Sequence, residues 1–220
     1  MDRGARPSHQ AETDPGLLIK TKPSGSAGAG RAAPHRVRII GGRYRRTPIA
    51  VADRPGLRPT SDRVRETLFN WLQHLRPDLE AAHGLDLFAG TGALGFELAS
   101  RGAPRGVLVE RDPLLVRKLD ALRQRLGAGG VEVIAGDALE VARRLPASSF
   151  DLVFLDPPYA EPMLWPAIEA ARRLLRDGGL IYAEAPGPLD PSAVGQAGLD
   201  VLRCGRAGRV HFYLLALGLS

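Results

Sequence analysis

The stretch that most constrains the fold is the apolar run from Phe150 to Leu155, which leads into Asp156-Pro-Pro-Tyr159. A short apolar run bounded by polar residues is typical of a strand that is buried on both faces of a parallel sheet. The two prolines end this strand, because proline has no N–H for the sheet ladder and restricts the residue before it. We therefore expect a central strand with a carboxylate, proline carbonyls and an aromatic ring at its carboxyl end, where open α/β sheets bind their ligands.

From Gly84 onward, strand and helix patterns alternate, as they do in a doubly wound α/β fold. The patterns predict strands at 85–89, 106–110, 131–135, 150–155 and 179–184, and helices at about 92–101, 113–126, 138–145 and 162–176. Two last strands, around Val201-Leu202 and Val210–Leu217, have no helix between them and should be antiparallel neighbours. The fold class is thus α/β, with a mostly parallel seven-stranded sheet of Rossmann-like type that contains one antiparallel strand.

The chain ahead of this alternation has two different compositions. Residues 1–34 are rich in Ala, Gly, Ser and Pro without an apolar period, so we predict a disordered tail. Residues 35–76 are predicted to form a small β-hairpin around Gly41-Gly42 and a helix capped by Thr60-Ser61-Asp62. The α/β domain then covers residues 77–220.

Positive charge is concentrated in one segment. Residues 35–65 contain nine arginines and two acidic residues, a net charge of +7, whereas the whole chain is +6. A localised basic surface favours a nucleic-acid partner over a merely solvated face. The arginines expected to contact nucleic acid are Arg38, Arg43, Arg45, Arg46, Arg58, Arg63 and Arg65.

The remaining composition limits the class of protein. The single cysteine, Cys204, excludes an internal disulfide framework and fits a reducing compartment. No apolar run is long enough to span a bilayer, and the first thirty residues lack the apolar core of a signal peptide. The five histidines show no metal-ligand spacing. We therefore expect a cytoplasmic, monomeric protein without a metal.

A glycine-rich turn, Asp86-Leu-Phe-Ala-Gly90-Thr-Gly92-Ala-Leu-Gly95, joins the first strand of the domain to its first helix. Its glycines let the backbone turn tightly and approach a ligand, while the helix amino end points free N–H groups at it. The same spacing fits the dinucleotide fingerprint, so an NAD enzyme is an open alternative at this point. Glu110 is suited to a ribose diol and Asp137 to an adenine amino group; the alternative for each is a plain helix-start residue. The predicted cofactor-binding residues are Asp86, Phe88, Ala89, Gly90, Gly92, Glu110, Asp137 and Ala138.

The residues after the fourth strand of the domain favour methyl transfer to an exocyclic amino group of a nucleobase. Such a nitrogen is a poor nucleophile because it is conjugated with its ring. The Asp156 carboxylate and the Pro157 carbonyl can accept hydrogen bonds from its two N–H groups, which frees the nitrogen lone pair. Tyr159 can stack on the base, a contact worth roughly 1–3 kcal/mol. A hydride-transfer enzyme has no evident use for this set. The predicted catalytic residues are Asp156, Pro157, Pro158 and Tyr159; the alternative is a strand-ending turn with a capping Asp.

Four segments together resemble the RsmD family, whose members are S-adenosylmethionine-dependent guanine-N2 methyltransferases of small-subunit ribosomal RNA. They are Arg38-Ile-Ile-Gly-Gly-Arg43, Arg58-Pro-Thr-Ser-Asp-Arg-Val-Arg-Glu-Thr-Leu-Phe-Asn-Trp71, Asp86-Leu-Phe-Ala-Gly-Thr-Gly-Ala-Leu-Gly95 and Asp156-Pro-Pro-Tyr159. The resemblance implies S-adenosyl-L-methionine as cofactor, held by Gly90, Gly92 and Glu110, and a guanine amino group held by residues 156–159. It also implies small-subunit (16S) ribosomal RNA, or an assembling small subunit, as partner.

Two other functions remain compatible with these motifs. One is an amino-methyltransferase that acts on adenine in DNA or RNA; the DNA enzymes usually carry a separate target-recognition domain, for which no stretch between the motifs is long enough. The other is a non-catalytic RNA-binding module that has kept the fold. Nothing in 86–95 or 156–159 looks disabled, which favours an enzyme.

Overall fold

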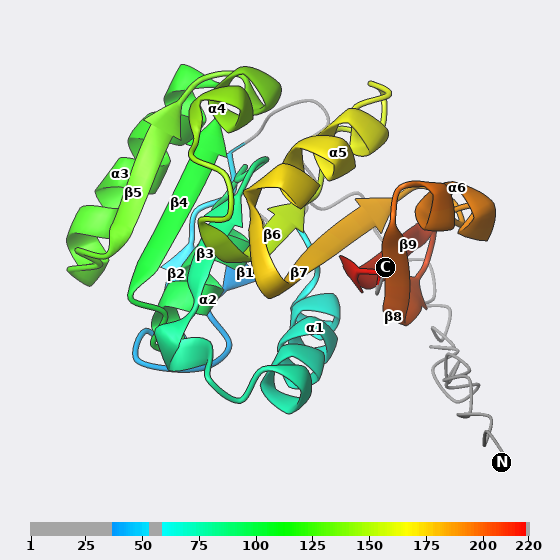
Figure 1. Ribbon diagram of the computed structural model, residues 1–220. Coiled ribbons are helices and arrows are strands. Elements are labelled where there is room, and N and C mark those ends of the chain that lie inside the picture. Colours follow the sequence, from blue (N-terminus) through cyan, green and yellow to red (C-terminus); the bar gives the residue numbers. More distant parts are fainter. Residues whose placement is uncertain (1–36, 53–58, 219–220) are drawn as a thin grey trace, which may run out of the picture.

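One seven-stranded sheet organises the computed structural model of the protein, which describes residues 37–52 and 59–218 (Figure 1). Its strands follow the order β5-β4-β3-β6-β7-β9-β8. The bounds are β3 (His83–Asp86), β4 (Arg105–Glu110), β5 (Val131–Ala135), β6 (Phe150–Leu155), β7 (Leu175–Ala185), β8 (Leu199–Ala207) and β9 (Val210–Leu217). Only β9 runs against its neighbours β7 and β8, so the predicted sheet with one antiparallel strand is confirmed. The predicted tail, residues 1–34, and Arg58 lie outside the described residues.

Helices cover both faces of this sheet. The described helices are α1 (Asp62–Leu75), α2 (Ala93–Ser100), α3 (Pro113–Leu126), α4 (Ala138–Arg144), α5 (Leu164–Leu174) and α6 (Pro191–Gln196), with a 3₁₀ turn, η1 (Leu79–Ala81). One face packs against α4, α5 and α6, and the other against α1, α2 and α3. All six residues of β6 are buried, as expected for a strand covered on both sides. No helix within the described ranges is long and apolar enough to cross a membrane.

The structure moves some predicted boundaries and adds one helix. Strand β7 begins at Leu175, earlier than the predicted strand at 179–184, because the chain enters the sheet directly after α5 and pairs again beyond a register shift. Strand β3 ends at Asp86, since the residues after it already belong to the glycine-rich turn. Helix α6 was not predicted; Asp190 caps it by accepting a hydrogen bond from the backbone N–H of Ser192, 2.9 Å away.

The predicted N-terminal hairpin is present as β1 (Val37–Arg38) paired with β2 (Pro48–Ile49). Its connection lies against the carboxyl end of α2, where the Arg43 backbone N–H donates to the Ser100 carbonyl over 2.6 Å. Gly42 has φ of +72°, and a Cβ there would lie 1.8 Å from the Ser100 carbonyl oxygen. Only glycine therefore permits this close approach.

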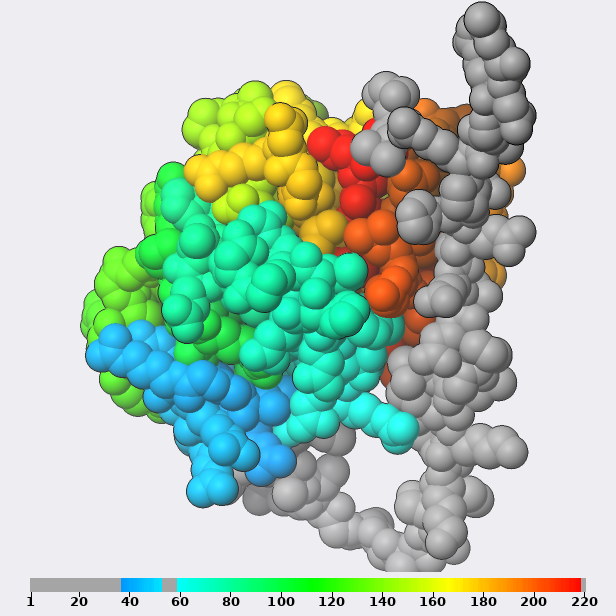
Figure 2. Space-filling model, turned by 60° about the horizontal axis from the view of Figure 1, so that its bottom comes forward, coloured from blue at the N-terminus to red at the C-terminus, as the bar shows by residue number. Residues whose placement is uncertain are grey.

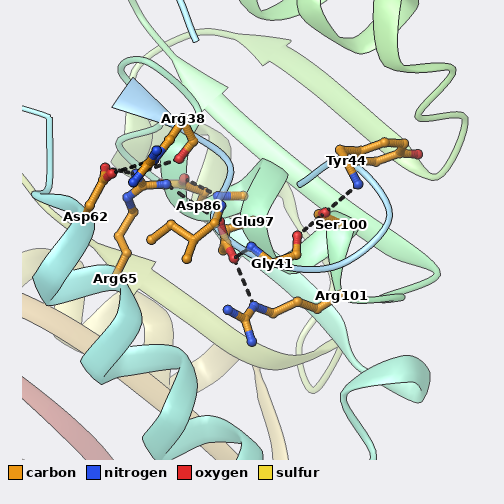
Figure 3. A network of polar contacts seen from close by, with 11 residues as sticks. Arg38, Gly41, Tyr44, Asp62, Arg65, Asp86, Glu97, Ser100 and Arg101 are labelled. Carbon is orange, nitrogen blue, oxygen red and sulfur yellow. Dashed lines mark hydrogen bonds and ion pairs between the residues drawn. The ribbon is translucent and has the colours of Figure 1, made fainter. Parts of the chain in front are cut away.

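A buried carboxylate, Glu97 on α2, attaches the hairpin to the rest of the protein (Figure 3). Its Oε2 accepts the Ile40 N–H over 2.7 Å, and its Oε1 accepts the Gly41 N–H and the Arg101 Nε–H, each over 2.9 Å. On the other side, Arg65 of α1 places Nη1 3.6 Å from Glu97 Oε2. One side chain thus connects the hairpin, α1 and α2.

Arg65 does not fit the predicted contact with nucleic acid. Its side chain is fully buried, and its Nη2 donates to the Arg38 carbonyl over 2.8 Å and to Asp62 Oδ1 over 2.7 Å. A guanidinium with no exposed surface cannot reach a phosphate. The sequence pattern misled here because Arg65 lies on the same helix face as the core residues Leu68, Phe69 and Leu72, and it is neutralised inside the protein by Asp62 and Glu97.

We expect Glu97→Gln to lower the free energy of unfolding by about 3–5 kcal/mol, because it removes the anion from a buried ion pair and leaves Arg65 poorly compensated. Urea unfolding measures this loss, and hydrogen exchange at the Ile40 and Gly41 amides should become faster. Glu140→Gln is the matched control; its ion pair with Arg143 is exposed and should be worth about 0–1 kcal/mol. Equal losses in the two variants would contradict the anchoring role of Glu97.

Candidate active site

A cleft of about 1000 Å³ lies at the carboxyl ends of β3, β4, β5 and β6. Strands β3 and β6 are neighbours, although α2, β4, α3, β5 and α4 separate them in the chain. The connections leave in opposite directions at this point, which is where doubly wound sheets form their ligand crevice. The lining includes Thr60, Asp86, Phe88, Ala89, Gly90, Glu110, Asp137, Ala138, Asp156, Pro157, Pro158, Tyr159 and Glu184. The predicted catalytic residues and all but one of the predicted cofactor residues therefore share one space.

Glu110 holds the glycine-rich turn in place. Its Oε2 accepts the Gly90 N–H and its Oε1 accepts the Asp112 N–H, each over 2.8 Å. The cap of α3 is Asp112, so Glu110 is not a plain helix-start residue. Its carboxylate lies between the turn after β3 and the end of β4, a position from which further lone pairs can accept hydroxyl groups in the cleft.

Gly92 and Asp137 have identifiable structural roles. Gly92, with φ of +79°, is the predicted residue that does not line the cleft, and a Cβ there would lie 2.6 Å from both Leu119 and Phe96. It is needed for the turn and for packing beneath it. Asp137 lines the cleft and also caps α4, accepting the Leu139 and Glu140 N–H groups over 2.9 and 3.1 Å. Asp137 therefore caps the helix, and it also lies where a ligand in the cleft could be bound.

Asp86 is an acid kept in an unfavourable environment. It is 2% exposed, its Oδ2 accepts the Gly95 N–H over 3.2 Å, and its Oδ1 has no hydrogen-bond partner within the described part of the chain. Burial raises the pKa of this carboxyl to about 7, and the charge of Glu110 adds to the effect, against the opposing backbone N–H groups of Gly95 and Phe88. An unpaired buried acid at the cleft wall is suited to a cationic ligand.

Two further residues join Asp156 at the other end of the cleft. Thr60 Oγ1 lies 2.9 Å from Glu184 Oε1 and 3.5 Å from Asp156 Oδ2. The Tyr182 hydroxyl donates to Glu184 Oε1 over 2.8 Å, and Tyr159 is also hydrogen-bonded to Glu184. Burial raises the pKa of Asp156 well above its usual range, and the charges of Glu184 and Asp86 raise it further. The sequence analysis missed Thr60 and Glu184; the only signal was a glutamate within the apolar run of β7.

The described arginines of the predicted nucleic-acid set lie outside the cleft. Arg38, Arg43, Arg45, Arg46 and Arg63 are exposed, and the hairpin (blue) and α1 (cyan) adjoin on one face in Figure 2. The loop with residues 43–46 contacts the carboxyl end of α2, whereas the amino end of α2 faces the cleft. Eight residues of helix separate these ends by about 12 Å. The loop therefore lies about one length of α2 away from the cleft wall.

A second basic surface lies closer to the cleft. Ala207 and Val210, at the turn between β8 and β9, line the cleft, and the intervening residues of this turn include the exposed Arg209. Arg206 is exposed beside them. These two arginines were not predicted from the charge pattern, because they lie far from the arginine-rich segment 35–65 in the chain.

The acids of the cleft do not form a metal site. Among residues 37–52 and 59–218, no group of three or more His, Cys, Asp or Glu side chains has an arrangement that could hold a metal ion.

Comparisons with known proteins relate the chain to a protein family. The family model described as "Conserved hypothetical protein 95" matches residues 37–216. The ribosomal RNA small subunit methyltransferase D of Escherichia coli (strain K12) is 41% identical over 150 residues, which are 68% of this chain and 72% of the relative. The protein of the same name from Haemophilus influenzae is 39% identical over 158 residues, covering 69% and 80% of the two chains.

Solved structures agree with the sequence relatives. A putative methyltransferase from Escherichia coli superposes with a TM-score of 0.71 at 37% identity, covering 84% of this chain and 99% of that one. A putative methylase from Haemophilus influenzae gives a TM-score of 0.67 at 33% identity, with the same coverage. A putative RNA methyltransferase from Pyrococcus horikoshii, at 21% identity and a TM-score of 0.59, shares the fold.

We expect Asp86→Asn to stabilise the empty protein, and to do so more at alkaline than at acidic pH. The folded pKa of about 7 lies above the usual 3.8, so the native state binds this proton more tightly than the unfolded state. Stability is therefore lost as the pH rises from the lower to the higher value, by about 4 kcal/mol in total. Urea unfolding at about pH 5 and about pH 8 should show the larger gain at the higher pH. A gain independent of pH would contradict this assignment, and the exposed Asp177→Asn is the control, expected to change stability by less than about 0.5 kcal/mol.

Proposed function

Because the chain belongs to the conserved hypothetical protein 95 family, the RsmD family that its motifs resemble, we propose that it methylates small-subunit ribosomal RNA. The methyl acceptor that we propose is the exocyclic N2 amino group of a guanine, and the methyl donor is S-adenosyl-L-methionine. The family relationship favours this function over a hydride-transfer enzyme, and the ribosomal RNA activity named for the relatives favours RNA over DNA. A ribosomal RNA substrate also agrees with the predicted cytoplasmic location. The predicted monomer stays a prediction.

One observation carries the proposal: the glycine-rich turn and Asp156-Pro-Pro-Tyr159 line the same cleft at adjacent strands. Methyl transfer requires donor and acceptor to meet in one space that excludes water. A separate position for the two motifs would have been difficult to reconcile with such a reaction. The shared cleft matches it.

The residues of the cleft fit the proposed donor. S-adenosylmethionine supplies an electrophilic methyl group on a positively charged sulfur and carries a ribose, an adenine and an ammonium group. Among the described residues, one carboxylate oxygen of the buried Asp86 has no hydrogen-bond partner, which suits a cationic ligand. Glu110 and Asp137, at the ends of neighbouring strands, offer acceptors for hydroxyl and amino groups.

The acceptor side provides the rest of the chemistry. Asp156 and the Pro157 carbonyl accept hydrogen bonds from the two N–H groups of the amino nitrogen. These bonds favour a lone pair that is localised on the nitrogen. The nitrogen would form its new bond to the methyl carbon as the carbon–sulfur bond breaks and the sulfur leaves as a neutral thioether. The nitrogen becomes cationic, and Asp156 would take the proton that it then loses. The raised pKa of Asp156 makes this carboxylate a stronger base than an exposed aspartate. Pro158 and Tyr159 line the same wall and can contact the faces of the base.

We propose that residues 35–76 form the RNA-contacting extension and residues 77–220 the methyltransferase domain. Arg206 and Arg209 are also exposed, beside the cleft-lining turn between β8 and β9. Five further exposed arginines are available to phosphates: Arg38, Arg43, Arg45, Arg46 and Arg63. Phosphate contacts of this kind position the RNA without reading its sequence.

Transfer of a radiolabelled methyl group tests the function. The protein should label small-subunit ribosomal RNA, either naked or in assembling particles, and not duplex DNA. Nuclease digestion and mass spectrometry should identify N2-methylguanosine as the product and locate it in the RNA. A product methylated on adenine would contradict the proposed acceptor.

We expect Asp156→Ala to lower kcat by roughly 100-fold or more, because it removes both an acceptor for the amino group and the base that takes its proton. Binding of S-adenosylmethionine, measured by calorimetry, should survive, since Asp156 is assigned to the acceptor. Asp177→Ala, at an exposed position of β7, is the matched control. A large loss of affinity for S-adenosylmethionine in Asp156→Ala would show that Asp156 binds the donor, and would contradict its assignment to the acceptor.

Replacing Arg43, Arg45 and Arg46 together by Gln should raise KM for the RNA and flatten its dependence on salt. Each phosphate contact that is lost removes about 0.7–0.9 from the slope of log K against log salt concentration. Donor affinity should not change. RNA binding across a salt series measures the slope, with Arg117, Arg143 and Arg144 replaced by Gln as the control on α3 and α4. Equal slopes for wild type and the hairpin variant would show that these arginines are only solvated.

A further inference from the structure

We propose that Glu184 selects guanine by accepting a hydrogen bond from the ring N1–H, beside the amino group that Asp156 and Pro157 hold. This inference rests on the proposed function and assigns the specificity of the same site to a residue outside the glycine-rich turn and the Asp-Pro-Pro-Tyr segment.

The register of the sheet places Glu184 next to Asp156. Leu155, the last residue of β6, is the parallel partner of Ala183 in β7. The residue that follows each member of this pair carries a carboxylate: Asp156 directly after β6, and Glu184 near the end of β7. The two side chains are therefore neighbours at the same edge of the sheet. Thr60 Oγ1 lies between them, at 3.5 Å from Asp156 Oδ2 and 2.9 Å from Glu184 Oε1. Both carboxylates line the cleft.

Glu184 is buried without a cation to neutralise it. It is 4% exposed, and no Lys, Arg or His forms an ion pair with it within the described part of the chain. Its partners are hydroxyl groups, from Thr60, Tyr182 and Tyr159. Burial raises the pKa of Glu184, and burial together with the Glu184 charge raises that of Asp156. Asp156 is partly buried beside it, and neither acid forms an ion pair with a cation among the described residues. Two adjacent acids in this setting are costly to maintain, and a ligand that donates hydrogen bonds to them would lower that cost.

The ordinary structural acids of this protein look different. Glu97 is also buried, but it accepts two backbone N–H groups and faces two arginines, Arg65 and Arg101. Asp151 is paired with Arg76 and Arg176. In the described part of the chain, Glu184 is bonded by neither a backbone donor nor a cation, and it lines the cleft. Its hydroxyl partners hold the carboxylate in a fixed orientation and leave it with lone pairs for a ligand.

Guanine is the base whose edge complements two adjacent acceptors. Its Watson–Crick edge presents the N1–H and the N2 amino group as neighbouring donors. Adenine and cytosine also have an amino group, but each has a ring-nitrogen lone pair beside it, which would face the Glu184 carboxylate. A flipped-out base is read on this edge by hydrogen bonds, and a site built to bond an N–H discriminates strongly against an analogue without it.

An RNA with 2-aminopurine in place of the target guanine tests the assignment. This base keeps the N2 amino group but has an acceptor at N1. Wild type should methylate the guanine RNA at least about 10-fold faster, as kcat/KM, since a hydrogen bond to a charged group is lost. Glu184→Gln, whose amide can donate to N1 of 2-aminopurine, should bring the two rates closer together or invert their order. Glu169→Gln, the same change on the outer surface of α5, should keep the wild-type ratio.

The outcomes separate this inference from the proposed function. If wild type does not methylate the guanine RNA at all, the proposed function fails. If wild type methylates guanine but Glu184→Gln keeps the wild-type ratio while binding the donor normally, Glu184 does not read N1 and the inference is overturned. If the variant does not fold, wild type is compared on guanine and 1-methylguanine RNAs; an unchanged rate with 1-methylguanine overturns the inference, and a loss of at least about 10-fold supports it.

Discussion

Strands β3 and β6 lie side by side in parallel, with Asp86 opposite Phe154, and the position of the whole site depends on this pairing. It brings the turn after β3 and the prolines after β6 to one edge of the sheet. Because β7 is the next strand, Glu184 is added to the same edge. The cleft is therefore a consequence of strand order, because Asp86, Asp156 and Glu184 lie at or next to the carboxyl ends of three neighbouring strands.

The same arrangement concentrates negative charge where the protein can least stabilise it. Asp86 and Glu184 are buried at the cleft and Asp156 is partly buried there, and desolvation raises the pKa of each. In contrast, Glu97 is equally buried but is surrounded by donors and cations, and it attaches the hairpin to the domain. Glu97 therefore stabilises the fold, whereas the acids of the cleft, which have no cation among the described residues, are the ones that we propose bind the ligands.

The N-terminal extension is continuous with the core of the domain. Val37, Ile39 and Ile49 of the hairpin pack with Phe96 and Leu119, and α1 packs on β6, β7 and β9. Trp71 and Phe212 are in contact, with ring centroids 5.4 Å apart. The hairpin and α1 are therefore held in a fixed position relative to the cleft, as the RNA-contacting role that we propose for them requires.

The sequence by itself determined the order of strands and helices, the sheet with one reversed strand, and the glycine-rich and Asp-Pro-Pro-Tyr segments of the site, because apolar periodicity and the backbone limits of glycine and proline are local properties. It could not determine that Arg65 is buried against Asp62 and Glu97, or that Glu184 stands beside Asp156. Those facts depend on which residues distant in the chain become neighbours. Burial and charge compensation arise only from that packing, so only the tertiary structure decided them.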